Sequence, residues 1–449
     1  MIPVLTPAEM EAVDAGASEP VEVLIDRAGG AVARAALARL GGTYGRRVVV
    51  IAGLGNNGAD GRVAAGRLQR AGVVVTVVPP DVAEIPTADL VIDAAYGTGL
   101  SRPYDPPSVG RTEVLAVDIP SGLDGSTGEI LGGALPATST VTFAAAKPGL
   151  VLGAGPEYSG TVEVADIGLD VSGATAHVVT DGDPRSWVPA RPPGAHKWRA
   201  ATWIIAGSRG MTGAARLCAT AALRSGAGYV RLSTPGPGAG PEDPIEAVGF
   251  PLPLEFWDRD VVYALERMSS MVIGPGLGRS DETVAAVRSL VTGANVPLVI
   301  DGDALAALGD RVARHVGARS APTILTPHDG EFERLTGSRP SPDRLADVRG
   351  LAAETGAVVL LKGPTTVIAA PDGRARFVTS GDQRLASAGT GDVLAGIIGA
   401  FLARGAEPLD AVAAAAHLHG RAGTRRPIGV IASDLVDVLP AVHAELGVD

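Results

Sequence analysis

Residues 47–61, RVVVIAGLGNNGADG, decide the fold of the first half of the chain. The apolar run predicts a buried strand, the glycines predict a tight turn, and a helix is expected from about Gly61 to Ala71. Further strands are predicted at 73–78, 89–94, 114–118 and 140–143. Continuous Val, Ile and Leu runs alternating with helices are typical of a parallel sheet covered on both faces. We therefore expect a Rossmann-like α/β domain, a three-layer sandwich.

The strand–helix rhythm stops at residues 180–198, TDGDPRSWVPARPPGAHKW, and then restarts. This segment is rich in Pro and has no periodic apolar face, which indicates a boundary with few contacts across it. We expect domains at 1–185 and 190–449, with a fragment from Pro189 to Asp449 folding alone. In the second domain, also α/β, strands are predicted at 202–206, 229–233, 271–274, 297–301, 323–326 and 357–361, a hairpin at 366–378, and helices at 212–225, 391–404 and 408–423. The last two helices are expected to close the chain.

Composition narrows the class of protein. The chain has 449 residues, 46% of them hydrophobic, and a formal net charge of −11, which argues against a nucleic-acid partner. Cys218 is the one cysteine, so an internal disulfide framework is excluded and a reducing compartment is favoured. The first residues show no leader pattern, and no run of about 18 apolar residues predicts a membrane span. We expect a cytoplasmic protein with no membrane partner.

The glycines of residues 53–58 match G-x-G-x-x-G between a strand and a helix, which is a dinucleotide-binding spacing. An ordinary glycine-rich turn has the same spacing, so the glycines alone leave both interpretations open. Asn56, Asn57 and Asp60 favour a ligand site, because packing does not call for two amides and a carboxylate on a tight loop.

Polar residues also follow two later strands. Asp93 ends one of them and is followed by GTGLSRP at 97–103, and DIPSGLDGSTG at 118–128 follows the other. Sheets of this class bind ligands at the carboxyl ends of their strands. The side-chain oxygens of Asn57, Asp93 and Ser121 suit a monovalent cation, and Asp118 is a candidate acid–base group. Helix capping is the alternative role of the two aspartates.

The motifs GNNGADG, VIDAAYGTGL, VDIPSGLDGSTG and TFAAAKPG together resemble the signature of the NAD(P)H-hydrate epimerase family, over roughly residues 1–175. The resemblance implies that Asn57, Asp93 and Ser121 hold K⁺ and that Asp118 contacts the reacting ring. The residues implied to bind the hydrated nucleotide are Asn56, Asn57, Gly58, Ala59, Asp60, Gly97, Thr98, Gly99, Leu100, Ser101, Arg102, Pro103 and Asp118. In two departures, Ala59 replaces the usual Gly, and residues 79–88 leave no room for the family's extra helix and strand.

The strongest motif in the chain is ASAGTGDVLAGIIG at 386–399. Gly389 and Gly391 allow backbone N–H groups to face an anion at the start of a helix. Asp392, in the first turn, is placed to accept a proton from a substrate hydroxyl near a terminal phosphate. The alternative is that Asp392 only stabilises the helix dipole. The same dipole is expected to depress its pKa.

Other stretches of the second half also follow predicted strands and suit the same kind of ligand site. They are GPGLG at 274–278, IDGDAL at 300–305, TPHDGEFERL at 326–335 and LKGPTT at 361–366. Lys362 suits a nucleotide phosphate. A lone histidine such as His328 is more often structural, but its position at the carboxyl end of a strand favours ligand contact.

Together these motifs resemble the ribokinase-like superfamily and, within it, the ADP-dependent NAD(P)H-hydrate dehydratases, over about residues 194–440. The resemblance implies that Ala214, Gly276, His328 and Asp392 contact the substrate, with Asp392 catalytic. The residues implied to bind the adenine nucleotide are Lys362, Gly363, Pro364, Thr365, Thr366 and Gly391. Two stretches depart from the family, namely residues 196–198 and the TSGDQRLAS that precedes the GTGD motif.

The expected function is therefore metabolite repair. One half epimerises hydrated NADH and NADPH (NADHX and NADPHX), and the other dehydrates the S form with ADP or ATP and Mg²⁺. A ribokinase-like kinase of a small alcohol is one alternative. A nucleotide-binding protein with a decayed N-terminal epimerase site is the other. We also expect a homo-oligomer.

Overall fold

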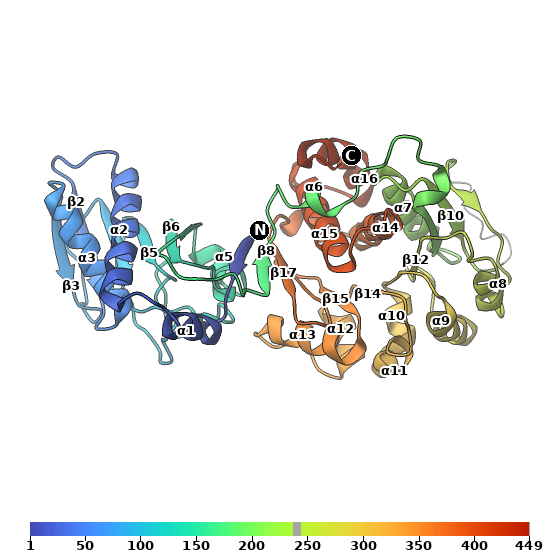
Figure 1. Ribbon diagram of the computed structural model, residues 1–449, viewed down its shortest axis with the longest axis horizontal. Coiled ribbons are helices and arrows are strands. Elements are labelled where there is room, and N and C mark those ends of the chain that lie inside the picture. Colours follow the sequence, from blue (N-terminus) through green and yellow to red (C-terminus); the bar gives the residue numbers. More distant parts are fainter. Residues whose placement is uncertain (237–243, 449) are drawn as a thin grey trace. The chain divides into compact units, whose positions relative to one another are not determined.

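The computed structural model describes residues 1–236 and 244–448. The chain divides into two compact units, Ile2–Ala176 and His177–Asp449. Each unit is built around its own sheet, and the helices lie against the faces of that sheet (Figure 1). Within the described residues, no helix is long and apolar enough to cross a membrane.

The first unit contains a parallel sheet whose strand order places a ligand crevice. Its strands are β2 (Arg47–Ala52), β3 (Val74–Val78), β4 (Leu90–Ala94), β5 (Glu113–Val117), β6 (Ser139–Phe143) and β7 (Thr161–Ala165). They lie in the order β3-β2-β4-β5-β6-β7. The chain leaves β2 for β3 on one side and returns to β4 on the other, so the order reverses between β2 and β4. In sheets of this class the ligand binds at that reversal, outside the carboxyl ends of the strands.

The two faces of this sheet are covered differently. Helices α2 (Val21–Leu40) and α3 (Asn56–Arg70) pack on one face over Val50 and Ile92. On the opposite face Tyr104 and Leu135 are buried on the strands, with Leu100 and Val109 packed beside them. The expected third layer is therefore made of loops, and residues 79–88 contain no helix. The remaining elements are β1 (Ile2–Val4), α1 (Pro7–Ala15), α4 (Pro148–Val151) and α5 (Gly155–Tyr158).

Helix α3 begins earlier than the sequence predicts. Gly55 is its N-cap, so residues 56–60 form the first helical turn and not a loop. The turn is tight because a Cβ on Gly53 would lie 1.9 Å from the Ala95 carbonyl oxygen, and one on Gly58 would lie 1.9 Å from the Gly53 carbonyl oxygen. The glycines thus let the chain turn directly from β2 into α3, and the polar residues are held on a rigid helix.

In the second unit the sheet runs β8-β17-β16-β15-β14-β13-β12-β9-β10-β11. Its strands are β8 (Ala176–Val178), β9 (Ala201–Ile205), β10 (Tyr229–Ser233), β11 (Val248–Gly249), β12 (Ser270–Ile273), β13 (Leu298–Ile300), β14 (Thr323–Leu325), β15 (Val358–Leu361), β16 (Thr366–Ala369) and β17 (Ala375–Val378). From β11 to β15 the neighbours are parallel, whereas β16 and β17 form the expected antiparallel hairpin. The carboxyl ends of β9, β12, β13, β14 and β15 therefore share one edge.

Helices cover both faces of this second sheet (Figure 1). On one face lie α7 (Thr212–Arg224), α14 (Thr390–Ala403), α15 (Pro408–Thr424) and α16 (Ala432–Leu446). On the other lie α9 (Asp281–Gly293), α10 (Asp303–Leu308), α11 (Val312–Val316), α12 (Asp329–Thr336) and α13 (Arg344–Thr355), with α8 (Trp257–Tyr263) beside α9. The expectation that α14 and α15 close the chain was wrong, because α16 follows them.

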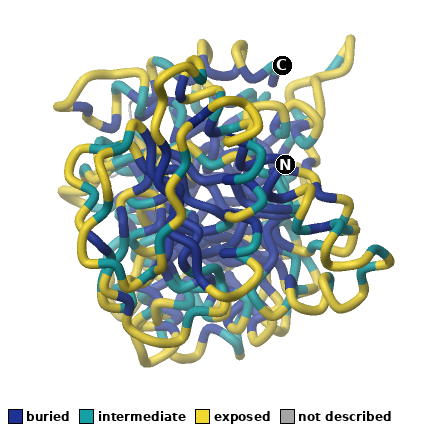
Figure 2. Tube along the Cα trace, turned by 90° about the vertical axis from the view of Figure 1, so that its left-hand side faces the viewer, coloured by how far each residue is buried: buried dark blue, intermediate teal, exposed yellow. Residues whose placement is uncertain are grey.

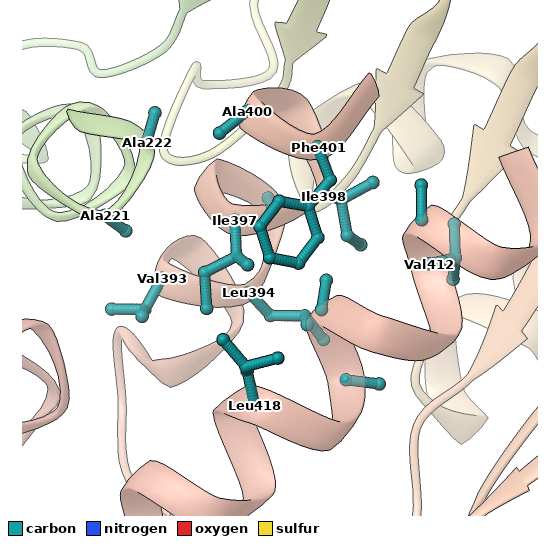
Figure 3. Packing of buried hydrophobic residues seen from close by; sticks show 14 of the residues in the cluster. Ala221, Ala222, Val393, Leu394, Ile397, Ile398, Ala400, Phe401, Val412 and Leu418 are labelled. Atoms are coloured by element: carbon teal, nitrogen blue, oxygen red, sulfur yellow. The ribbon is translucent and has the colours of Figure 1, made fainter. Parts of the chain in front are cut away.

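Helix α14 is fixed by close packing on several sides. Phe401 is fully buried, and its ring lies among apolar side chains of α14 and α15 (Figure 3). A Cβ on Gly396 would lie 2.2 Å from the Cys218 carbonyl oxygen of α7, and one on Gly399 would lie 2.5 Å from Val272 of β12. The small residues of this helix thus allow α7 and β12 to approach closely, which sets the position of its N-terminus.

Residues 180–198 belong to the second unit, so the division of the chain lies before the expected boundary. The segment contains α6 (Pro184–Trp187) and the short helix η1 (Lys197–Ala200). Val188 is buried in the same core as α14, and Arg404 donates to the Pro189 carbonyl oxygen at 2.7 Å. A buried valine and hydrogen bonds to the backbone hold the segment against the second unit, although its sequence has no apolar periodicity. Figure 2 shows that buried stretches lie inside and that most of the loops around them are exposed.

Candidate functional site

A cavity of about 1130 Å³ opens in the first unit at the carboxyl ends of β2 and β4. Its volume suits a ligand of nucleotide size. Ten of the residues predicted to bind substrate line it: Asn56, Asn57, Asp60, Gly97, Thr98, Gly99, Leu100, Ser101, Arg102 and Asp118. Gly58, Ala59 and Pro103 are not part of the lining. Apolar walls come from α1, α2 and the end of β6, including Met10, Leu24 and Phe143.

Asp93 and Ser121 are buried behind the cavity wall. Ser121 Oγ donates to Asp93 Oδ1 at 2.6 Å, and the Ser121 N–H donates to Asp93 Oδ2 at 2.8 Å. The Tyr96 N–H in turn donates to Ser121 Oγ at 2.9 Å. Burial raises the pKa of Asp93, and its hydrogen bonds oppose that rise. The pair therefore ties the loop after β4 to the loop after β5.

Asn57 is the third residue predicted to bind the cation. Neither its side-chain oxygen nor its nitrogen has a hydrogen-bond partner, although both atoms are buried. A Cβ on Gly97, next to Tyr96, would lie 3.6 Å from the Asn57 side chain. The Asn57 amide oxygen has no hydrogen-bond partner and lies close to the loop that contacts Ser121. Together with the buried Asp93 carboxylate, it fits a monovalent cation.

Asp118 adopts a backbone conformation that side chains rarely take, with a φ of 67°. Its Oδ1 accepts hydrogen bonds from Lys147 Nζ at 2.5 Å and from Thr142 Oγ1 at 3.1 Å. Lys147 is only 1% exposed. The sequence analysis quoted Lys147 within a motif but gave it no role. A lysine four residues after the strand β6 was the available signal.

Four further carboxyl groups line this cavity, on Asp14, Glu19, Asp60 and Asp81. Burial, together with the negative charges of Asp118 and Asp14, raises the pKa of Asp60 to about 8. Burial also raises the pKa of Asp14, against the opposing charge of Lys147. The Asp60 carboxyl group therefore keeps its proton near neutral pH. Asp14 was missed because α1 carries no recognisable motif.

In the second unit the N-terminus of α14 lies beside the loop after β15. Gly389 is the N-cap, with a φ of 92°. A Cβ on Gly391 would lie 3.4 Å from Lys362 Nζ and 3.9 Å from Asp301 Oδ2. The structure thus brings together three residues from the ends of β13, β15 and the start of α14. An anion at this helix end would face both backbone N–H groups and the Lys362 ammonium.

The pKa of Asp392 is shifted opposite to the expectation from the helix dipole. Burial raises it to about 6, with Asp301 and Asp303 acting in the same direction and Lys362 against them. Desolvation and neighbouring carboxylates therefore outweigh the dipole. The result suits a base, because a carboxylate with a pKa near the working pH accepts a proton more readily than one of ordinary acidity.

Asp301 is a second residue to which the sequence analysis gave no role. It is 3% exposed and accepts from Lys362 Nζ at 2.6 Å and from Thr326 Oγ1 at 2.7 Å. Burial alone would lower the pKa of Lys362, but the charges of Asp301 and Glu331 raise it. Asp301 therefore holds the lysine charged beside the helix N-terminus.

The remaining predicted residues lie along the same edge of the sheet. Ala214 and Gly276 are neighbours, since a Cβ on Gly276 would lie 2.9 Å from the Ala214 Cβ. Gly363, Pro364, Thr365 and Thr366 follow Lys362 into β16. Arg344 donates to the Lys362 carbonyl oxygen at 2.9 Å, which fixes the start of that turn.

His328 has a structural role that the sequence left open. Its Nδ1 accepts from the N–H groups of Gly330 at 3.0 Å and Glu331 at 3.3 Å, so it caps α12. The side chain is 56% exposed. Capping occupies one ring nitrogen and leaves Nε2 at the surface, 3.5 Å from Glu331.

Comparisons with known proteins agree with this division. The family described as NAD(P)H-hydrate dehydratase matches residues 202–437, and the family described as YjeF-related protein N-terminus matches residues 21–84 and 79–149. A bifunctional NAD(P)H-hydrate repair enzyme Nnr of Salinibacter ruber is 37% identical, covering 99% of this chain and 96% of its own. The corresponding enzyme of Mycobacterium tuberculosis is 38% identical, covering 83% and 82%.

A solved structure resembles the second unit. It is the ADP/ATP-dependent NAD(P)H-hydrate dehydratase of Bacillus subtilis, co-crystallized with ATP/Mg²⁺. The TM-score is 0.52 and the identity is 32%, and the match covers 60% of this chain and 98% of that one.

Proposed function

The chain belongs to the family of bifunctional NAD(P)H-hydrate repair enzymes, and from this premise we propose that it epimerises hydrated NAD(P)H and dehydrates the S form with ADP or ATP. The observation that carries the proposal is the group formed by Asp392, Lys362 and Asp301 at the start of α14. A kinase of a small alcohol would share this group, but it would leave the N-terminal cavity without a role.

In the dehydration, Lys362 and the backbone at Gly391 bind the phosphates of the nucleotide. Asp392 accepts the proton of the C6 hydroxyl as that oxygen attacks the terminal phosphorus, so the hydroxyl becomes a phosphate ester. Phosphate then leaves C6 while C5 loses a proton, which restores the dihydropyridine ring. Ala214, Gly276 and the exposed nitrogen of His328 bind the substrate along the same edge.

Mg²⁺ accompanies the nucleotide and neutralises charge on its phosphates. Among the described residues, no three His, Cys, Asp or Glu side chains are grouped to hold a metal. This fits an ion bound mainly by phosphates and water, as Mg²⁺ usually is with nucleotides.

In the first unit, Asn57, Asp93 and Ser121 hold K⁺. The orphaned Asn57 amide and the buried Asp93 carboxylate support this assignment, since both gain from a cation. The ion offsets the buried charge and orders the loops that line the cavity.

One assay tests the two activities together. The purified chain is mixed with both epimers of hydrated NADPH, Mg²⁺ and ADP or ATP, and recovery of the reduced-nicotinamide absorbance is followed. Complete conversion without a pause supports both halves. Conversion that pauses after the S epimer is used up means that the epimerase half is silent, and no conversion contradicts the whole proposal. Replacing K⁺ by Li⁺ in the assay should make conversion pause after the S epimer is used up.

A further inference from the structure

Five carboxyl groups and one ammonium group line the N-terminal cavity, and three of the carboxyl groups interact electrostatically with one another. Asp14 comes from α1, Asp60 from α3 and Asp118 from the end of β5, while Lys147 precedes α4. The other titratable groups of the lining are Glu19, Asp81, Tyr96 and Arg102. Epimerisation at C6 requires a proton to be taken from one atom of the substrate and given to another, so two groups in opposite protonation states are needed.

Lys147 is held without access to bulk water. Besides Asp118, its Nζ donates to Thr142 Oγ1 at 2.9 Å and to the carbonyl oxygens of Phe143 and Ala145, each at 3.2 Å. Burying an ammonium group is costly unless it is paired and fully hydrogen-bonded. Here the paired carboxylate is the one that faces the cavity, so the buried charge serves to hold Asp118.

The two oxygens of Asp118 are therefore in different surroundings. Oδ1 accepts from Lys147 and Thr142. Oδ2 faces the loop after β4, where a Cβ on Gly97 would lie only 3.5 Å away. The left-handed backbone of Asp118 adds to this picture, because such strain is kept where the surrounding structure imposes it, often at functional sites. Oδ2 is the oxygen left for a substrate.

Asp60 supplies a protonated carboxyl group in the same cavity. Its side chain is on the first turns of α3, is 6% exposed and lines the same cavity as Asp118. With a pKa of about 8 it keeps its proton at neutral pH. Two carboxyl groups whose surroundings separate their protonation states are a usual basis for paired acid and base roles.

We propose that Asp118 and Asp60 are the base and the acid of the epimerisation, and that Lys147 is the positioning residue that leaves Oδ2 of Asp118 free; this inference rests on the proposed function. In the opening step, Oδ2 takes the proton of the C6 hydroxyl, the C6 oxygen becomes a carbonyl, and the C6–N1 bond breaks. The electron pair of that bond goes to N1, which receives the proton of Asp60. Rotation about C5–C6 and the reverse transfers close the ring on the opposite face, and no co-reactant is consumed.

The test measures interconversion of the purified R epimer of hydrated NADPH by chromatography, with the full chain and without nucleotide, so that dehydration is silent. The variants are Lys147→Met, Asp118→Asn, the double variant and Asp60→Asn. Arg111→Met, which removes an exposed charge away from the cavity, is the matched control. We expect losses in kcat of about a hundredfold for each aspartate and about tenfold or more for Lys147→Met, with KM within about twofold.

The double variant decides between a positioning and a merely structural role. If Lys147 acts through Asp118, the double variant is no slower than Asp118→Asn alone, whereas independent roles multiply the two losses. The wild-type rate should also fall as pH rises through about 8, and that decline should disappear from the residual rate of Asp60→Asn. If Lys147→Met does not fold, Thr142→Val takes its place. This variant removes the second hydrogen bond to Asp118 Oδ1, and its kcat should be severalfold lower than that of the wild type.

The two possible failures are distinguishable. Wild-type protein that does not interconvert the epimers contradicts the proposed function itself, and this inference with it. Normal wild-type interconversion combined with multiplicative losses, or with a wild-type rate for Asp60→Asn, overturns the inference alone.

Discussion

The two units place carboxyl groups at the same kind of position, the carboxyl edge of a parallel sheet, but surround them differently. In the first, Asp118 is held by a buried lysine inside a cavity walled partly by apolar side chains. In the second, Asp392 is half-buried in the first turn of a helix, next to a lysine whose partner is another carboxylate, Asp301. In the first unit, Lys147 holds the carboxylate that lines the cavity. In the second unit, the carboxylate of Asp301 holds Lys362.

The largest effect on the two rates should come from replacing each aspartate by asparagine, which exchanges one carboxylate oxygen for an amide nitrogen. Asp392→Asn should lower dehydration of the S epimer on the order of a hundredfold, since a positioned base is lost, while epimerisation without nucleotide stays unchanged. Asp118→Asn should give the reverse pattern. Both rates are measured on the same preparations, so each variant is the control for the other. Loss of both activities in either variant would show that the units do not act independently.

Two fragments test where the second unit begins. A fragment of residues 176–449 keeps β8 and α6, whereas one starting at Pro189 loses both, together with the buried valines 179 and 188. Burial of two valines is worth about 3 kcal/mol or more, so the shorter fragment should melt roughly 10 °C lower. Thermal unfolding by circular dichroism gives the comparison. Equal melting temperatures would mean that these residues contribute nothing to the core.

The two activities should respond to pH in opposite directions. On the proposed mechanism, dehydration needs ionised Asp392, whose pKa is raised to about 6, so its rate should fall about tenfold per pH unit below that value. With Asp60 as the proposed acid, epimerisation needs its protonated form, so the rate should fall as pH rises through about 8. The pKa of Asp60 is higher in the folded state than in the unfolded state. The free energy of unfolding therefore decreases as pH rises from the unfolded pKa to the folded pKa. Asp60→Asn should therefore raise the melting temperature above pH 8, and parallel profiles for both activities would contradict the assignment.

The smallest effect concerns His328. His328→Ala should destabilise the second unit by about 1 kcal/mol through loss of the α12 cap, whereas His328→Asn should retain the cap. If the exposed ring nitrogen also binds substrate, both variants should show a raised KM for the hydrate. A normal KM for His328→Asn would leave capping as the whole role of this histidine. Melting curves and steady-state kinetics on the same samples separate the two contributions.

Elements whose apolar residues are continuous could be predicted, and those whose packing depends on small residues could not. Strand β2 was predicted with its observed bounds, and helices α14 and α15 within a residue or two. Helix α2 was missed because Gly29 and Gly30 resemble a break in a helix. In the structure a Cβ on Gly29 would lie 2.5 Å from Val63 Cβ, so the glycine allows α2 to approach α3.

The motifs determined by themselves which loops form the two sites. The glycines at 53–58 have the spacing of a turn between a strand and a helix, those at 389–391 mark the start of a helix, and polar residues follow several strands. These signals are local, because each depends on residues that are neighbours along the chain. They were enough to point to Asp118 and Asp392 and to the family to which the chain belongs.

Only the tertiary structure decided the partners and the charge states. Lys147 meets Asp118, and Lys362 meets Asp301, across 29 and 61 residues of sequence. The pKa of Asp392 rises although its place in a helix predicts a fall, because burial and two distant aspartates outweigh the dipole. Desolvation and charge–charge interaction depend on distances through space, which sequence separation does not specify. The sequence therefore pointed to the candidate sites, and the fold determined the hydrogen-bond partners and the pKa shifts of the residues in them.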